Sequence, residues 1–360
     1  MLSLLETNYK DHAPESAQPL PESILKEIPF VELTVRSEAP HLFEDSAKVV
    51  LAFFPSWRPE ELDFYQCKDG ITNKLVKVTR KETGECVLVR AYGRNSEIII
   101  DRGQEIMNIV CLSNLELAPP LFGRFKNGLV YGYIPGRIFS VDDMAEAQKS
   151  ALVARRLAQW HKVKLPIERQ SRLFSTLYKW LKEVPTEFAD GKRDAILKKH
   201  FTPNRLIEEV KFLEQALAKF NSPVVFCHND LLHANIIYTE SDDVAFIDME
   251  YASYSFRGFD IGNHFNEYAG FDCDYSRYPS KETQLLWLSQ YLSAYHPDQA
   301  VDMKELEELY AEVDAFSLAS HLYWCLWALA QAKISDIDFD YLGYAVLRFN
   351  EYLRRKAEVF

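Results

Sequence analysis

The stretch from His228 to Asp248 constrains the fold of this chain more than any other. It places Asn235 five residues after Asp230, and Asp248 another thirteen residues on. Three short apolar segments around these residues are typical of strands: Pro223–Cys227, Ile236–Tyr238 and Val244–Ile247. The polar run between the last two is typical of a turn. We therefore expect a loop and a hairpin that bring the three polar side chains together on one side of a cleft.

These residue types are the ones that phosphoryl transfer requires. One carboxylate accepts the proton of an attacking hydroxyl, and an amide oxygen and a second carboxylate hold Mg²⁺ on ATP. In the alternative, the segment is a solvated loop whose acids only form turns. We disfavour that alternative because three suitable residues and a matching strand pattern would have to coincide. Asp230, Asn235 and Asp248 are therefore the candidate catalytic residues.

Composition excludes several other classes of protein. A net charge of −12 disfavours a nucleic-acid binder that uses a broad basic surface. The six cysteines form no CxxC pair, which favours reduced thiols over a disulfide framework or a zinc site. The apolar run at 322–330 is too short to cross a bilayer, and charged residues near the start disfavour a signal peptide. We expect a cytoplasmic protein without stable membrane insertion.

The chain shows three regions. Residues 1–40 are rich in Pro, Glu and Ser and predict an extended or partly disordered lead-in. Residues 41–134 predict a small β-rich, nucleotide-binding lobe, and residues 135–360 a large helical lobe that carries the catalytic loop. Pro135-Gly136 is a plausible hinge between them. The predicted fold class is therefore α+β and bilobal.

Periodicity predicts the individual elements. The expected strands cover residues 62–67, 75–79, 86–92, 121–125 and 129–134, with a hairpin turn at residues 82–85. The expected helices cover residues 41–54, 101–112, 145–163, 170–182, 203–220, 280–295, 302–333 and 338–356.

The nucleotide side has no GxxxxGK[ST] and no GxGxxG motif, which disfavours a P-loop enzyme. The turn at Asp69–Lys74, which contains Asn73, is a candidate cover for phosphates. An ordinary hairpin explains that turn equally well. Tyr133 and Ile134, just before the hinge, are expected to place backbone groups against adenine.

Arg90 is a cation on the otherwise apolar strand VLVRAY. Glu105, in the following helix, is placed to pair with it and hold it against nucleotide phosphates, as a lysine and a glutamate do in protein kinases. A purely structural salt bridge is the alternative.

Aromatic residues gather after the catalytic hairpin. Rings with a nearby carboxylate form a suitable pocket for an organic ammonium ion. Tryptophans at helical spacing are also common in a core, so this pattern alone leaves both interpretations open. The candidate pocket residues are Tyr251, Glu267, Trp324, Trp327 and Tyr344. Asp260, in the same region, is expected to accept backbone hydrogen bonds that brace the catalytic loop.

Five segments carry a family resemblance. They are DGITNKL at 69–75, VLVRAYG at 87–93, FCHNDLLHANIIY at 226–238, FDIGNHFNEYAG at 259–270 and FDYLGYAVLRFNEY at 339–352. With these segments the chain resembles the choline/ethanolamine kinase family, and within it the ethanolamine kinases. The resemblance implies a protein-kinase-like bilobal fold and the transfer of phosphate from ATP, with Mg²⁺, to ethanolamine. That reaction is the first step of the CDP-ethanolamine route to phosphatidylethanolamine.

The resemblance also implies roles for single residues. Asp230 matches the family's catalytic base, Asn235 and Asp248 match its magnesium ligands, and Arg90 matches a cation that contacts the nucleotide phosphates. Glu250 matches a further contact to the metal or to its ligands. The aromatic residues and Glu267 match the walls of the amino-alcohol pocket. Two departures, His233-Ala234 and Met249, concern the branch within the family and not the chemistry.

Three alternatives remain. In the first, the acceptor is choline, or both amino alcohols. In the second, the chain is a kinase of aminoglycosides or fructosamines; such kinases share the catalytic loop but have no counterpart of the set Trp324, Trp327 and Tyr344. A pseudokinase that only binds a nucleotide is disfavoured because Asp230, Asn235 and Asp248 are all present. The sequence leaves open whether the chain forms a homodimer.

Overall fold

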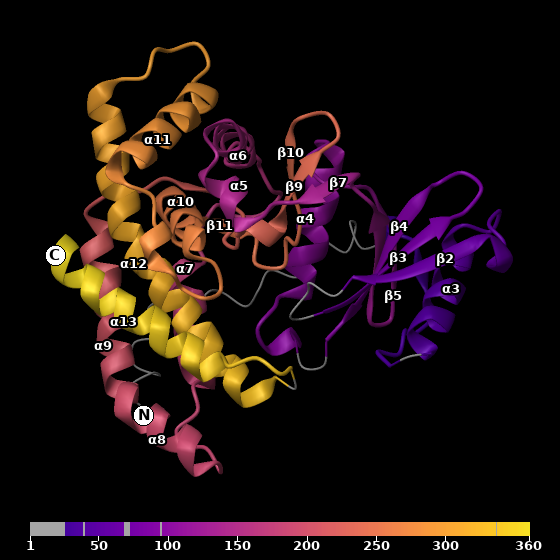
Figure 1. Ribbon diagram of the computed structural model, residues 1–360, viewed down its shortest axis with the longest axis horizontal. Helices are drawn as coiled ribbons and strands as arrows, with labels where there is room; N and C mark the ends of the chain where they lie inside the picture. The colour runs from indigo at the N-terminus through magenta and orange to yellow at the C-terminus, as the bar shows by residue number, and fades with distance from the viewer. Residues whose placement is uncertain (1–25, 39, 68–72, 94–95, 336) are drawn as a thin grey trace. The chain divides into compact units, whose positions relative to one another are not determined.

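The structure is a computed structural model that describes residues 26–38, 40–67, 73–93, 96–335 and 337–360. The described chain divides into two compact units, both drawn in Figure 1. The N-terminal unit comprises residues 26–137 and 239–250, and the C-terminal unit comprises residues 138–238 and 251–360.

A six-stranded sheet in the order β1-β5-β6-β4-β3-β2 forms the body of the N-terminal unit. β1 pairs in parallel with β5, and the other pairings within this sheet are antiparallel. The strands are β1 (Phe30–Val31), β2 (Leu62–Cys67), β3 (Asn73–Arg80), β4 (Cys86–Tyr92), β5 (Leu121–Phe125) and β6 (Gly128–Gly132). Helices α3 (His41–Phe53) and α4 (Arg102–Asn114) and the short turns η1 (Pro59–Glu61) and η2 (Ser96–Ile98) complete this part.

Alternating valines form the core beneath this sheet. Val76 and Val78 of β3 pair with Val89 and Val87 of β4, so the four side chains share one face. All four are buried, and Val49 of α3 belongs to the same core cluster. The alternation of apolar and polar residues therefore fixes which face of the sheet α3 covers.

The described part of the predicted lead-in is packed on the N-terminal unit. Phe30 and Val31 form β1 beside β5. Val35 is buried in the core, and the Asn127 side chain binds both its N–H (3.0 Å) and its carbonyl (2.8 Å). This packing was not expected, because a short apolar segment among prolines and acids shows no periodicity. Residues 1–25 and 39 lie outside the described residues.

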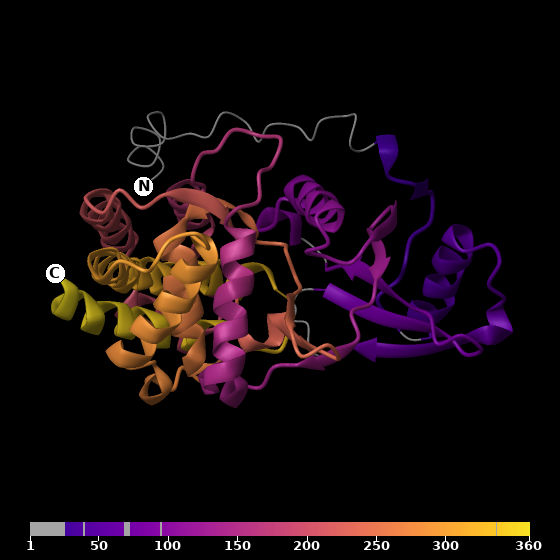
Figure 2. The same ribbon diagram turned by 90° about the horizontal axis from the view of Figure 1, so that it is seen from above.

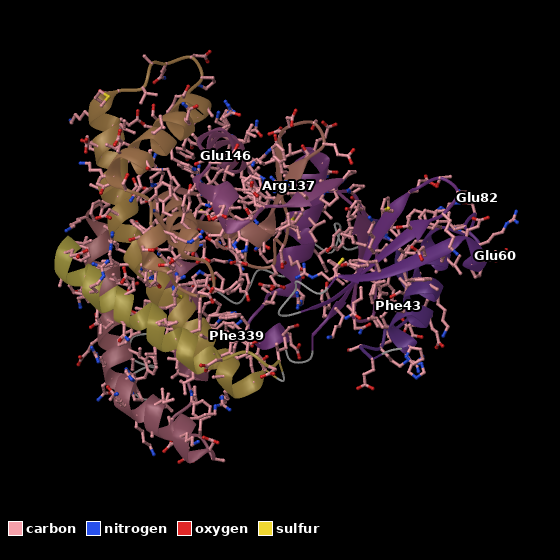
Figure 3. The ribbon with its side chains drawn as sticks, viewed as in Figure 1. Phe43, Glu60, Glu82, Arg137, Glu146 and Phe339 are labelled. Atoms are coloured by element: carbon pink, nitrogen blue, oxygen red, sulfur yellow. The ribbon has the colours of Figure 1, made fainter. Side chains whose placement is uncertain are left out.

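The expected hairpin turn joins β3 to β4. Gly84 has a φ of 74°, in the left-handed region that glycine adopts without strain. Its N–H donates to the carbonyl of Arg80 at 2.8 Å. Figure 3 shows Glu82 of this turn at the same end of the sheet as Glu60, which precedes β2. The pairing of Leu62 with Arg80 requires that arrangement.

The C-terminal unit is mostly helical. Its helices are α5 (Val141–Ala145), α6 (Ala147–Trp160), α7 (Leu173–Glu183), α8 (Gly191–His200), α9 (Pro203–Ala218), α10 (Arg257–Asn266), α11 (Lys281–Tyr295), α12 (Met303–Ile334) and α13 (Tyr341–Val359), with short turns η3 (His233–Asn235), η4 (Glu267–Ala269) and η5 (Tyr275–Arg277). α12 packs against α10 and α13, and α12 and α13 lie side by side in Figures 1 and 2. Residues 315–332 of α12 are all buried, as expected for a helix that is apolar on every side. No helix in the described chain combines the length and apolar character that a membrane crossing requires.

Gly262 lets α10 approach α12 closely. A Cβ at this position would lie 2.8 Å from Ser317 N and 2.9 Å from Val313 O. One turn further along, Asn266 Nδ2 donates to Ser317 O at 2.9 Å. The crossing is therefore fixed by backbone contact and a buried hydrogen bond.

Short strands flank residues 228–235, the segment predicted to be the catalytic loop. β8 (Val224–Cys227) pairs antiparallel with β11 (Ser253–Phe256), with Cys227 opposite Ser253. This pairing ties the start of the loop to the segment after Glu250. The remaining strands are β7 (Gly136–Ile138), β9 (Ile236–Thr239) and β10 (Val244–Phe246).

Most expected elements are present, with ends that shift by a few residues. Among the elements that were not expected are α8, α10 and β11. α8 has little apolar periodicity, and two glycines within ten residues mask α10.

The division of the chain differs from the expected one at the hinge and at a later segment. Residues 135–137 and Thr239–Glu250 group with the N-terminal unit, whereas residues 135–360 were all expected in the helical lobe. The physical reason for the later segment is that Asp248 and Glu250 both pair with Arg90 of β4.

Replacing Gly262 with alanine should destabilise the C-terminal unit. The new Cβ meets backbone atoms that cannot rotate away, so α10 must move off α12. We expect the free energy of unfolding to fall by about 1–3 kcal/mol, as in other overpacked cores. Gly191→Ala is the control, since nothing lies within 4 Å of its added Cβ. Denaturant unfolding measures both variants, and equal stabilities would contradict the argument.

Candidate active site

Asp230 and Asn235 lie together in the C-terminal unit. β8 leads into the loop that carries Asp230, and η3 ends at Asn235. Asn235 Nδ2 donates to Asp230 Oδ2 at 3.0 Å and to the Asp230 carbonyl at 2.8 Å. Because Nδ2 is turned toward Asp230, Asn235 Oδ1 is the atom left to bind a cation.

Asp260 of α10 holds this loop from behind. Its Oδ2 accepts from His228 N–H at 2.8 Å, and its Oδ1 accepts from Asn229 N–H at 2.7 Å. His161 Nε2 lies 3.0 Å from Oδ2, and its Nδ1 lies 2.8 Å from Tyr291 Oη. Burial, the largest single effect, opposes ionisation of Asp260, but its interactions with His161, His228 and the Asn229 N–H together lower its pKa. The expectation that Asp260 braces the catalytic loop is confirmed.

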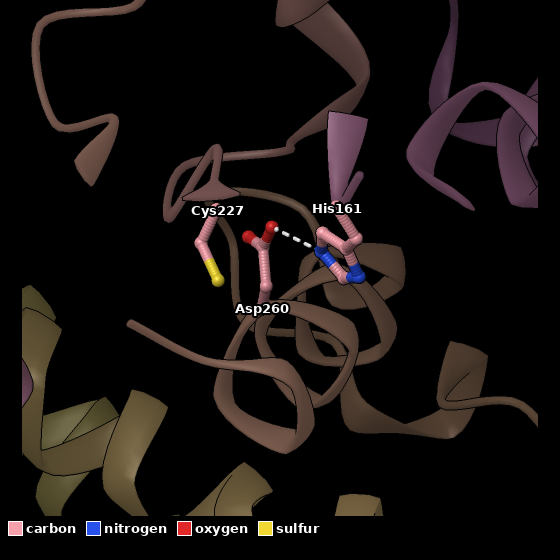
Figure 4. Close-up of side chains that lie close together, drawn as sticks. All are labelled: His161, Cys227 and Asp260. Atoms are coloured by element: carbon pink, nitrogen blue, oxygen red, sulfur yellow. Dashed lines mark hydrogen bonds and ion pairs between the residues drawn. The ribbon is translucent and has the colours of Figure 1, made fainter. Parts of the chain in front are cut away.

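The same region brings His161, Cys227 and Asp260 close together, as Figure 4 shows. One ligand atom of each lies within 4.8 Å of the others, and all three residues are buried. Both oxygens of Asp260 are already used by backbone N–H groups. Burial raises the pKa of the Cys227 thiol well above its usual value, which disfavours the thiolate that a metal requires. The arrangement therefore favours a hydrogen-bonded brace over a metal site.

Asn229 adopts a left-handed conformation, with a φ of 65°. Asparagine tolerates this region better than most residues. Its Nδ2 donates to Tyr251 O at 2.9 Å and to Ser253 Oγ at 3.0 Å. These bonds tie the catalytic loop to Tyr251, one of the candidate pocket residues.

His264 supports the loop at a second point. It lies one turn after Asp260 on α10, and its Nδ1 donates to the Leu231 carbonyl at 2.9 Å. Its Nε2 is buried and has no hydrogen-bond partner within the described residues. Burial lowers the pKa of His264 to about 4. The imidazole is therefore neutral at physiological pH.

The expected aromatic residues come together in the C-terminal unit. The Tyr251 and Trp324 rings lie 5.4 Å apart, and the Trp324 and Trp327 rings lie 5.5 Å apart, both edge to face. Trp327 Nε1 donates to Tyr251 Oη at 2.8 Å, and Trp324 Nε1 donates to Asn263 Oδ1 at 2.7 Å. These bonds fix the ring orientations, so the three rings form a rigid aromatic cluster.

Glu267 and Tyr344 both bind Arg348, a residue that was not predicted from the sequence. Arg348 Nη1 donates to Glu267 Oε1 at 2.9 Å and to Tyr344 Oη at 3.3 Å. The expected direct contact of Glu267 with an ammonium ligand stays a prediction. One oxygen of the carboxylate is already occupied by this arginine.

In the N-terminal unit, Arg90 is the centre of a buried ion cluster. Its Nη1 lies 3.0 Å from Glu105 Oε1, and its Nη2 lies 2.9 Å from Asp248 Oδ1 and 2.5 Å from Glu250 Oε2. Burial opposes its charge, but the three carboxylates hold the pKa of Arg90 well above its usual value. The expected pairing of Arg90 with Glu105 is confirmed. Its contact with nucleotide phosphates stays a prediction.

Asp248 and Glu250 differ in what they offer a metal. The Asp248 side chain is 32% exposed and its backbone is left-handed, with a φ of 62°. The Glu250 side chain is 2% exposed and also lies 3.5 Å from Arg102 Nη1. Burial and the charge of Asp248 raise the pKa of Glu250 to about 7, against the effect of Arg90. Asp248 is therefore the better candidate ligand, and Glu250 is an ion-pair partner of two arginines.

The remaining nucleotide candidates are only partly described. Asn73 begins β3 opposite Tyr92, and the preceding residues 68–72 lie outside the described residues. Tyr133 follows β6, and Lys77 Nζ lies 3.9 Å from its ring centre. Ile134 is half-buried. The assignment of Asn73, Tyr133 and Ile134 to the nucleotide site stays a prediction.

These features are those of a small-molecule phosphotransferase with a protein-kinase-like fold. The sequence model of the choline/ethanolamine kinases matches residues 64–353. Ethanolamine kinase 1 of Mus musculus is 42% identical over 347 residues, which are 92% of this chain and 95% of that protein. The probable ethanolamine kinase A of Dictyostelium discoideum is 42% identical over 321 residues, 87% of this chain and 91% of that protein. The chain belongs to the choline/ethanolamine kinase family.

Solved structures agree with this assignment. The ethanolamine kinase of Plasmodium vivax is 30% identical, covers 94% of both chains and has a TM-score of 0.79. The choline kinase of Cryptosporidium parvum has a TM-score of 0.72 at 24% identity, covers 88% of this chain and 96% of its own, and supports the fold alone.

Replacing His264 with asparagine should reduce the acid sensitivity of the fold. The unfolded state binds a proton at this residue below about pH 6.5, whereas the folded state binds one only near pH 4. Stability should therefore fall as the pH drops through this window, by at most about 3 kcal/mol from this residue. Asparagine keeps a donor for Leu231 O but cannot titrate.

Denaturant unfolding of wild type and His264→Asn at pH 7.0, 5.5 and 4.5 measures this difference. The wild type should lose more stability than the variant between pH 7.0 and 4.5. The same pH dependence in both proteins would refute the role given to His264.

Proposed function

We propose that this protein transfers the γ-phosphate of ATP to the hydroxyl of ethanolamine, which yields phosphoethanolamine and ADP. The observation that carries the proposal is that one unit holds both the base candidate Asp230 and the aromatic cluster. The identity of about 42% to ethanolamine kinases over most of the chain supports this acceptor. The product is the one that enters the CDP-ethanolamine route to phosphatidylethanolamine.

Asp230 acts as the base at the acceptor. It is 9% exposed and hydrogen-bonded to Asn235, so its carboxylate is held in one position. After burial and the charge of Glu267, the charge of Asp230 also raises the pKa of Tyr344, one of the candidate pocket residues. The carboxylate orients the substrate hydroxyl and takes its proton as the new P–O bond forms.

The aromatic cluster binds the substrate ammonium. Tyr251, Trp324 and Trp327 present ring faces and edges in fixed orientations. Each ring contributes about 0.5–2 kcal/mol to a desolvated cation. Glu267 adds a carboxylate that accepts hydrogen bonds from the ammonium N–H groups. Such a bond is available to ethanolamine and not to choline, which carries no N–H.

We assign Mg²⁺ to Asn235 and Asp248, as the family resemblance implies, because each offers a hard oxygen ligand. Asn235 presents its amide oxygen, and Asp248 is the most exposed acid of the Arg90 cluster. Bound Mg²⁺ would neutralise charge on the phosphates of ATP. Glu105 and Glu250 hold Arg90, which we assign to the same phosphates.

A choline-preferring or dual kinase is the second candidate, because the aromatic cluster suits both amino alcohols. A pseudokinase is disfavoured by the ordered pair of Asp230 and Asn235. We also propose a cytoplasmic location, since the six cysteines, which all lie within the described residues, form no disulfide.

Replacing Asp230 with asparagine should abolish most turnover while the KM for ATP stays unchanged. The shape of the side chain is kept and the base is lost, so we expect kcat to fall by about 10²–10⁴-fold. Asp142→Asn is the matched control, because this exposed carboxylate has Arg277 as its ion-pair partner within the described residues. Coupled measurement of ADP release gives both constants. Wild-type kcat in Asp230→Asn would exclude the proposed base.

The acceptor itself is tested with wild-type protein. Steady-state assays with Mg-ATP should give a higher kcat/KM for ethanolamine than for choline. The reverse order would favour the second candidate, and no ADP release with either would exclude the proposed function.

A further inference from the structure

Arg348 lies in the interior of the C-terminal unit and contacts two predicted pocket residues. It is 1% exposed. Its Nη1 donates to Glu267 Oε1 at 2.9 Å and to Tyr344 Oη at 3.3 Å. Its Nη2 donates to Ser320 Oγ of α12 at 3.0 Å. A single guanidinium therefore joins α13, α12 and the end of α10.

The hydrogen bonds continue from Ser320 to the aromatic cluster. Ser320 Oγ donates to Asn263 Oδ1 at 2.8 Å, and Trp324 Nε1 donates to the same atom at 2.7 Å. The indole nitrogen is only a donor, so this bond fixes the orientation of the Asn263 amide. Arg348 is thus linked to Trp324 through two buried side chains.

The residues in the middle of this network are fully buried, whereas those at its ends are slightly exposed. Ser320 and Asn263 have no exposed surface. Glu267 is 6% exposed, Trp324 is 5% exposed and Tyr344 is 7% exposed. The inner residues are therefore unable to touch a ligand, whereas the three predicted pocket residues retain some accessible surface.

Stability alone is a weak reason for such an arrangement. A buried ion pair costs desolvation that its attraction often fails to recover, and apolar residues of the same size pack as well. What the pair provides is direction, because the planar guanidinium fixes the acceptors that it binds.

We infer that Arg348 is a positioning residue that gives the site its preference for primary over quaternary ammonium ions. It occupies Glu267 Oε1 and leaves Oε2 as the acceptor for one substrate N–H. Within the described residues, Oε2 takes part in no hydrogen bond or ion pair. The inference rests on the proposed function and adds the source of its selectivity.

Electrostatics alone gives the opposite expectation, which makes the inference testable. Arg348 is a cation beside a site for a cation, so its removal would tighten ammonium binding if only charge mattered. If Arg348 acts by aiming Glu267, its removal weakens the binding of substrates with N–H groups. The sign of the change in KM therefore separates the two roles.

The test compares Arg348→Met, Arg348→Lys and Arg355→Met. Arg355 is the matched control, since it lies on the same helix and pairs with Asp314, which is outside the network. The substrates are ethanolamine, its N-methyl and N,N-dimethyl derivatives, and choline, which carry progressively fewer N–H groups. KM for ATP is measured in parallel as a readout of intact nucleotide binding.

In Arg348→Met we expect the KM for ethanolamine to rise about tenfold or more, the change typical of one lost charged hydrogen bond. The effect should shrink along the methylated series, so the ratio of kcat/KM for ethanolamine to that for choline falls. Arg348→Lys keeps the charge and should retain part of the preference. Arg355→Met should leave the ratio unchanged. An unchanged or lower KM for ethanolamine in Arg348→Met would overturn the inference.

The network has two arms: one joins Arg348 to Glu267, and the other runs through Ser320 and Asn263 to Trp324. Ser320→Ala tests the second arm. It removes the hydrogen bond from Ser320 to Asn263, while Glu267 keeps its arginine. KM should therefore rise for ethanolamine and choline alike, because both depend on the ring. A loss confined to ethanolamine would contradict the separation of the two arms.

A double variant keeps the test decisive if Arg348→Met fails to fold, since that change leaves the Glu267 carboxylate buried without a partner. Glu267→Gln and the double variant Glu267→Gln/Arg348→Met should show the same ratio of ethanolamine to choline, because Arg348 acts through Glu267. A further fall of the ratio in the double variant would overturn the inference. Inactivity of the wild type toward ethanolamine would instead overturn the proposed function.

Discussion

The candidate chemistry of the C-terminal unit depends on the hydrogen bonds that the Asp260 carboxylate accepts from the catalytic loop. It binds two consecutive backbone N–H groups, those of His228 and Asn229, immediately before Asp230. A buried carboxylate is costly unless its oxygens are satisfied. Here His161 completes the set of donors. These hydrogen bonds restrict the loop, and positioning catalysis requires such preorganisation.

α10 uses its helical spacing to serve two parts of the candidate site. Asp260 and His264, four residues apart, both bind the catalytic loop. Asn263 and Glu267, also four apart, both belong to the network that ends at the aromatic cluster. Residues at this spacing share one face of a helix. Gly262 holds that helix against α12, so one backbone contact sets the position of both faces.

The sequence predicted those parts of the fold and site in which chemistry is local. The alternation of apolar and polar residues predicted strands β2 to β6. The spacing of Asp230 and Asn235 predicted that the two lie together, and their side chains are hydrogen-bonded. Asp260 was assigned correctly as an acceptor for the backbone N–H groups of the catalytic loop. Arg348 was missed because its partner Glu267 is 81 residues away, and its role depends on how three helices pack. α10 was missed because its glycines, needed for close packing, lower its helix propensity.

The placement of Arg348 suggests how a pocket built from aromatic rings distinguishes between two amino alcohols. Rings attract any ammonium ion, because the cation–π interaction does not depend on N–H groups. Discrimination therefore requires an acceptor that contributes to binding only when the ligand has an N–H group. A carboxylate with both oxygens free would instead attract either cation by charge. By neutralising much of the Glu267 charge and fixing its direction, Arg348 turns a general attraction into a directional hydrogen bond. A choline molecule would leave that buried acceptor unpaired, and the unmade bond is what sets the preference.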